Sequence, residues 1–225
     1  MAETNHDLSY MRSRDLRNWE TVVGKPVRLP VSPDNTDVLV DPVPIHGGIL
    51  NGSGKVGFDL DGKLVIAYHK FDKAGNTQLY FARPNAGRWE IVQASNWNYR
   101  WEIRGEGSLE PEITHGALTA KDGILSIDIR HIKEGNGAWS IDPETLTLQQ
   151  KIASFRPDFV MPRNLRGPVS RFPGMKVQTV QDAGSSSDCH IYRLRWESLG
   201  INRDKPREKP WPEPAMLQIV GWKKH

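Results

Sequence analysis

One stretch of the chain occurs twice, and this repeat restricts the fold more than any other feature of the sequence. The segment from Asp61 to His69 recurs 61 positions later as the segment from Asp122 to Arg130. The likeness continues through a Gly-Asn pair in each copy, at 75–76 and at 135–136. Such self-similarity predicts two copies of one supersecondary unit that bury their apolar faces by packing side by side.

Tight-turn residues divide each copy into short strands. Asp61-Gly62, Ala74-Gly75 and the run 85–87 separate strands expected near 54–60, 63–71, 76–83 and 88–94, because Gly and Asn accept the positive φ of hairpin turns. The second copy divides into strands near 113–120, 123–132, 137–141 and 146–154. The 8 Trp, 20 Gly and 16 Pro residues also favour short strands over long helices. We therefore predict an all-β fold, a β-propeller of four-stranded antiparallel blades.

The domain prediction is a single β-propeller domain over residues 1–225. Blade-like units cover about 54–95 and 113–154, and partial blades cover 5–24 and 175–222, with a strand from Cys189 to Trp196. Residues 24–53 contain five prolines and are expected to form a long loop. Two full blades fall short of the four to eight that propellers typically have. We expect a chain that lacks its N-terminal part or completes the propeller by self-association.

Charge and composition restrict the class of partner. The net charge is +3, and the basic residues are scattered, which favours an anionic polysaccharide or oligosaccharide over nucleic acid as a partner. A single cysteine, Cys189, excludes an internal disulfide and a cysteine zinc cluster. No apolar run approaches the roughly 20 residues of a membrane helix, and no secretory signal is visible, so we expect no membrane partner and leave the compartment open.

A short segment near the N-terminus, from Ser13 through Asp15 to Trp19, resembles the Asp-box turn of sialidase-like propellers. It lacks one residue and the glycine of that motif. In such a turn the Ser and Asp side chains bond backbone amides while the Trp packs between strands. The expected role is structural.

A wider resemblance covers most of the chain. It is carried by Gly57 to Gly62, Tyr68 to Asp72, Gly75 to Gln78, Asn98 to Trp101, Arg195 to Leu199 and Asn202 to Pro206. These segments are similar to BNR-repeat β-propeller proteins related to polysaccharide lyases, including ulvan lyases and rhamnose–glucuronate lyases. The resemblance implies a seven-bladed propeller and an extracellular or periplasmic location. We expect no required cofactor and allow for a structural calcium ion.

In the lyase branches the resemblance implies two histidines about one hairpin apart, then a tyrosine, then an arginine roughly one strand later. β-Elimination needs a cation for the uronate carboxylate, a base at C5 and an acid at the departing oxygen. His46, His69 and Arg130 have fitting separations, and the repeat leads us to expect His69 and Arg130 around one cavity. At the tyrosine's place the chain has His115. The second proton carrier is therefore expected to be His115, His46 or Tyr99.

The connector 96–102 is rich in aromatic residues and predicts a substrate-binding wall. Trp97 and Trp101 could stack on sugar rings while Arg100 binds a carboxylate, although packing between blades is the rival role. Asn51 is also expected to contact the substrate. The histidines lack close metal-ligand spacing, so we expect no metal site.

The sequence favours a lyase that cleaves a uronate-containing polysaccharide by β-elimination. Two alternatives remain. A sialidase-like glycoside hydrolase would need paired carboxylates or a Tyr nucleophile with acidic support, and no persuasive pair is present. A carbohydrate-binding propeller without catalytic activity would need only the connector and the scaffold.

Overall fold

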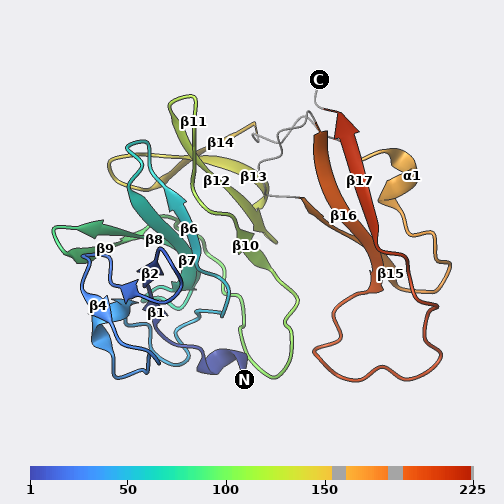
Figure 1. Cartoon of the computed structure of the whole chain (residues 1–225), viewed down its shortest axis with the longest axis horizontal. Helices are drawn as coiled ribbons and strands as arrows, with labels where there is room; N and C mark the ends of the chain where they lie inside the picture. Colours follow the sequence, from blue (N-terminus) through green and yellow to red (C-terminus); the bar gives the residue numbers. More distant parts are fainter. Residues whose placement is uncertain (154–160, 182–189, 224–225) are drawn as a thin grey trace. The chain divides into compact units, whose positions relative to one another are not determined.

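The computed structural model describes residues 1–153, 161–181 and 190–223, and it divides into two compact units, Met1–Phe155 and Arg156–His225. Seventeen strands form antiparallel sheets in these ranges, with three short helical turns (Figure 1). The all-β prediction is confirmed, with small antiparallel sheets that include the expected four-stranded kind. None of the helices in the described ranges has the length and apolar character needed to cross a bilayer.

The first blade is a four-stranded sheet in which each strand pairs with the next along the chain. It contains β6 (Lys55–Phe58), β7 (Leu64–Phe71), β8 (Thr77–Asn85) and β9 (Arg88–Gln93). Gly62, Gly75 and Gly87 have positive φ in the three hairpin turns. Asp59 and Asp72 accept turn amides through Oδ1. The turn residues therefore set these strands, as the sequence predicted.

The second blade departs from the prediction at its first strand. It contains β10 (Ile113–His115), β11 (Thr119–Lys121), β12 (Ile124–His131), β13 (Gly135–Ile141) and β14 (Leu148–Ile152). Both β10 and β11 pair with β12, so the strand expected near 113–120 is interrupted between them. This break places His115 at the end of a short strand, beside Gly116.

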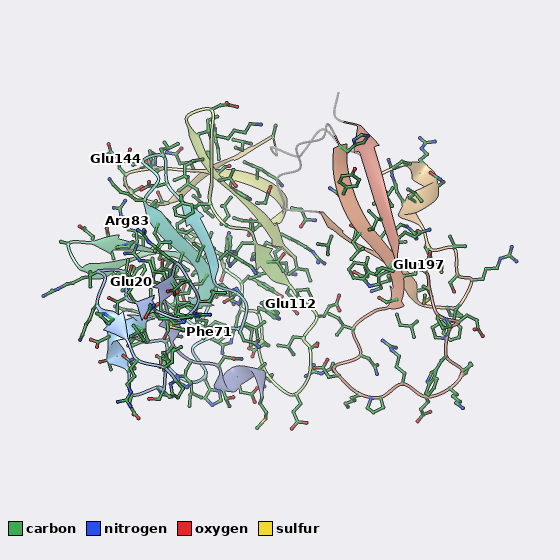
Figure 2. All side chains as sticks on the ribbon, in the orientation of Figure 1. Glu20, Phe71, Arg83, Glu112, Glu144 and Glu197 are labelled. Atoms are coloured by element: carbon green, nitrogen blue, oxygen red, sulfur yellow. The ribbon has the colours of Figure 1, made fainter. Side chains whose placement is uncertain are left out.

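A shared apolar core joins the two blades. Val65, Ala67, Leu79 and Phe81 of the first blade are in one buried cluster with Leu125, Ile127 and Ile129 of the second. At Gly57 an added Cβ would lie 2.7 Å from the backbone N and O of Leu118, so the two sheets approach backbone to backbone there. Arg83 at the end of β8 also donates to the carbonyl of Glu144 in the turn before β14 (3.1 Å; Figure 2). The blades therefore pack as one body.

The opposite face of the first blade packs on the N-terminal strands. The long loop expected over 24–53 in fact contains β4 (Pro26–Val27), η2 (Thr36–Val38) and β5 (Leu39–Asp41). Asp41 of β5 is buried and accepts hydrogen bonds from Lys70 Nζ and Tyr68 Oη, each at 2.5 Å. Burial and the bond to Asp41 raise the pKa of Tyr68, which keeps its hydroxyl protonated as the donor.

The N-terminal residues form η1 (Ala2–Thr4), β1 (Leu8–Ser9), β2 (Arg12–Ser13) and β3 (Trp19–Glu20). Between β2 and β3 is the Asp-box-like turn. Ser13 Oγ accepts the amides of Asp15 and Leu16, and Asp15 Oδ1 accepts those of Arg17 and Asn18. These bonds lower the pKa of Asp15. The amide-capping role expected for this turn is confirmed.

The second unit contains a three-stranded sheet in the order β15 (Met175–Gln181), β16 (His190–Leu199) and β17 (Gln218–Lys223), with α1 (Arg163–Arg166) before it. Arg195 is buried and donates to the carbonyls of Leu165 and Gly167 and to Glu197. This side chain ties the segment before the sheet to β16. Cys189, expected at the start of β16, lies outside the described residues.

Candidate functional site

A pocket of about 320 Å³ lies between the two blades within the first unit. Its walls come from the loop before β6, the start of β6, the end of β7, the 96–102 connector and the residues leading into β10. The lining residues are Leu50, Asn51, Gly52, Ser53, Lys55, His69, Trp101, Pro111, Ile113, Thr114 and His115. Four of the residues predicted to form a site, Asn51, His69, Trp101 and His115, therefore meet in one place.

His69 lies near the end of β7 and lines the pocket. Only 3% of its surface is exposed, and neither ring nitrogen has a hydrogen-bond partner in the structure. Its ring centroid is 5.5 Å from that of Trp101 and 6.0 Å from that of His115. Burial, with a smaller contribution from His115, lowers the pKa of His69 to about 3, so its imidazole is neutral at physiological pH.

His115 faces His69 from β10 of the second blade. Its Nδ1 is 3.0 Å from the carbonyl oxygen of Gly116, which can only accept, so Nδ1 carries the proton. The buried Nε2 then has a free lone pair and no hydrogen-bond partner. Burial lowers the pKa of His115, and the charge of Lys55 lowers it further. The neutral ring is therefore held in a tautomer suited to accept a proton from a ligand.

Lys55 and Ser53 line the same pocket, and the sequence reasoning missed both. Lys55 is the first residue of β6 and is exposed, whereas Ser53 is buried and its Oγ has no hydrogen-bond partner. Neither residue belongs to a motif. Alternation along β6 could have indicated Lys55, because it pairs with Ala67 and so shares the face of β7 that carries His69.

The aromatic connector is fixed to the first blade by Gln78, which is fully buried. Gln78 Oε1 accepts the Trp97 amide and the Ser95 hydroxyl, while Nε2 donates to the Trp97 carbonyl and to Asp72. Trp101 continues into the pocket, where 3% of its surface is exposed. Trp97 instead packs on His131, with ring centroids 4.7 Å apart. Of the two tryptophans, Trp101 alone lines this pocket.

Two other connector residues predicted to act in the site have partners elsewhere. Tyr99 donates to the carboxylate of Glu112, which directly precedes β10 (Figure 2), and this bond with burial raises the pKa of Tyr99 to about 12. Arg100 is exposed, with its Cζ 3.8 Å from the ring centroid of Phe71 and an ion pair to Glu102. Neither side chain is among those lining the pocket.

His46 and Arg130 are also placed away from this pocket. His46 is exposed in the loop after β5, where its amide donates to the Glu3 carbonyl. Arg130 is exposed on β12, on the face opposite the buried residues Ile127, Ile129 and His131. The repeat equates His69 with Arg130 on like faces, but successive blades pack unlike faces together. The structure therefore does not bring Arg130 to the cavity of His69.

No group of three or more His, Cys, Asp or Glu side chains suited to hold a metal ion occurs in the described ranges. The lining residues of the pocket include no carboxylate, and Lys55 is the one lysine or arginine among them. Such a pocket can bind an anion through Lys55 and can exchange a proton with it through His115.

Comparison with known proteins agrees with the blade architecture. No curated protein matches the chain. The matching family description names no enzymatic activity, and its range includes the first blade with Asn51, Ser53, Lys55 and His69 but ends before Trp101 and His115. Residues 1–97 match the model of a BNR repeat-containing family member.

Proposed function

We propose that the pocket between the two blades binds a uronate residue of an anionic polysaccharide or oligosaccharide and cleaves the chain by β-elimination. One observation carries the proposal. Four buried side-chain polar atoms without hydrogen-bond partners, Ser53 Oγ, His69 Nδ1, His69 Nε2 and His115 Nε2, belong to residues that line this one pocket. Buried polar groups are normally paired, so such a cluster supports a polar ligand that completes them.

Each side chain has a part in the proposed reaction. Lys55 neutralises the uronate carboxylate, which stabilises the charge that develops when the C5 proton leaves. His115 Nε2 accepts that proton, because its lone pair is free while Nδ1 is engaged by Gly116. His69 donates a hydrogen bond from its protonated ring nitrogen, and Trp101 provides an apolar wall for the sugar ring.

The atoms and electrons of this step balance without a further reagent. The C5–H bond breaks and its electron pair forms the C4–C5 double bond, while the bond from C4 to the glycosidic oxygen breaks. The His115 imidazolium then gives its proton to the departing oxygen, which returns the ring to the neutral state. The products are an unsaturated uronate end and a free hydroxyl end.

A glycoside hydrolase receives less support from the same pocket. Hydrolysis by either common route needs two carboxyl groups across the scissile bond. The residues lining this pocket include neither Asp nor Glu. A carbohydrate-binding role without catalysis remains the second candidate, since Trp101 and Lys55 alone could hold a sugar acid.

The test is incubation of the purified chain with uronate polysaccharides, including ulvan, gum arabic side chains and polygalacturonate. New ultraviolet absorbance from the unsaturated uronate supports the lyase. Reducing ends without that absorbance support a hydrolase instead. Binding by calorimetry without any product would overturn the catalytic proposal in favour of a binding module.

A further inference from the structure

Phe71, labelled in Figure 2, is the last residue of β7, two positions after His69. It contacts both chain segments that bring walls to the pocket. We propose that Phe71 is a positioning residue that holds the 47–53 loop and the 96–102 connector in fixed positions relative to His69. Its effect on catalysis rests on the proposed function, whereas its effect on the two segments does not.

The loop is held at its first residues. The Phe71 amide donates to the Gly47 carbonyl at 2.8 Å, and Gly48 lies directly against the Phe71 ring. An added Cβ at Gly48 would be 2.5 Å from the ring's Cδ1, so the backbone touches the ring with no room for a side chain. Asn51 and Ser53, which line the pocket, follow within the same loop.

The connector is held through Arg100. Its guanidinium carbon lies 3.8 Å from the Phe71 ring centroid, within the distance range of a cation–π contact. The same guanidinium donates to the Gly75 carbonyl at 2.7 Å, in the turn that follows β7. The next residue is Trp101, whose ring centroid is 5.5 Å from that of His69.

One side chain therefore connects three parts of the pocket. β7 carries His69, the loop carries Asn51 and Ser53, and the connector carries Trp101, and each of the two flanking segments meets Phe71 just before its lining residues. Lys55 and His115 reach the pocket from β6 and β10 instead. Loss of the Phe71 ring should thus impair the binding wall more than the proton transfer at His115.

The experiment compares Phe71→Ala with Phe71→Tyr, which keeps the ring, and with Phe58→Ala as the matched control. Phe58 is on β6 of the same blade and is 55% exposed. Amide hydrogen exchange is measured for all variants. We expect roughly tenfold or faster exchange in 47–53 and 96–102 of Phe71→Ala, with 124–131 of β12 unchanged, and wild-type rates in Phe71→Tyr and Phe58→Ala.

The second readout is steady-state kinetics on a uronate polysaccharide that the wild-type chain cleaves. We expect KM to rise about tenfold in Phe71→Ala while kcat changes less than about threefold, because the proton carriers stay in place. If Phe71→Ala does not fold, Arg100→Ala tests the contact between Phe71 and the connector. Faster amide exchange is then expected in 96–102 alone. Unchanged exchange in both segments would overturn the positioning role. Absent lyase activity in the wild-type chain would overturn the proposed function while the exchange data still decide this inference.

Discussion

The imidazole rings of His69 and His115 lie 6.0 Å apart, nearly perpendicular to each other, although they belong to strands of different blades. No hydrogen bond joins them, and Nε2 of His115 and both ring nitrogens of His69 have no partner. Two neutral imidazoles in one pocket are costly to bury without partners. The arrangement therefore makes sense if a ligand supplies those partners.

Replacement of His115 tests its proposed role as the general base. His115→Ala should lower kcat by roughly 10²–10⁴-fold, because that is the usual contribution of a positioned general base. The measurement is the rate of unsaturated uronate formation. His6→Ala is the matched control, because His6 has a side chain that is 42% exposed and lies outside the pocket. Full activity in His115→Ala would contradict the assignment.

The buried state of His69 predicts loss of stability in acid. In the unfolded chain His69 should titrate near its ordinary value of about 6.5, whereas burial lowers the folded pKa to about 3. The unfolded state therefore binds more protons between these values, so the free energy of unfolding should fall as pH decreases from about 6.5 toward 3.

Denaturant unfolding at a series of pH values measures this dependence. His69→Leu removes one titrating group, so its slope between pH 6 and 4 should be shallower by about 1.4 kcal/mol per pH unit at most. An identical slope in His69→Leu would show that the pKa of His69 does not differ between the folded and unfolded states, which would contradict this prediction.

Gln78 predicts a large effect on stability from a side chain that touches no ligand. Gln78→Leu would leave the buried amide and carbonyl of Trp97 without their partners and the Ser95 hydroxyl without its acceptor. We expect a loss of about 3 kcal/mol in the free energy of unfolding, measured by urea denaturation. The control is Gln149→Leu on an exposed strand position, for which a change within about 0.5 kcal/mol is expected. Equal effects of the two substitutions would argue against the network.

His131 predicts a specific ring tautomer. Its Nδ1 accepts the amides of Lys133 and Glu134 at 3.1 Å each, in the turn between β12 and β13. Nδ1 must then be unprotonated, and the proton is on Nε2, which is buried beside the rings of Trp97 and Tyr99. Ring nitrogen shifts in ¹⁵N NMR at neutral pH check this assignment. A protonated Nδ1 would exclude the capping role.

The sequence predicted local features well because local rules determine them. The Asp-Gly and Ala-Gly turns place the hairpins of the first blade through their own φ preferences, and Asp15 caps its turn through bonds to residues two and three positions away. The sequence also indicated the histidine pair, because His69 and His115 are both among the site residues expected from it.

The position of Arg130 shows where such reasoning fails. Equivalent positions of a repeat lie on the equivalent face of each sheet. The pocket, however, forms where one face of the first sheet packs against the non-equivalent face of the second. The residue opposite His69 is therefore decided by packing, and His115 is found there instead of Arg130. Ser53 belongs to no sequence motif. It is marked only by its buried hydroxyl without a hydrogen-bond partner, which the folded structure alone reveals.

The contact of Gly57 with the Leu118 backbone has a consequence for how this site can diversify. Gly57 is on β6, two residues after Lys55, and its backbone lies against the peptide groups of Leu118 with no side chain between them. This backbone contact therefore fixes the distance between the two blades at this level. The loop and the connector can therefore change in sequence and alter the walls of the pocket, while the gap that the two imidazoles span keeps the same width.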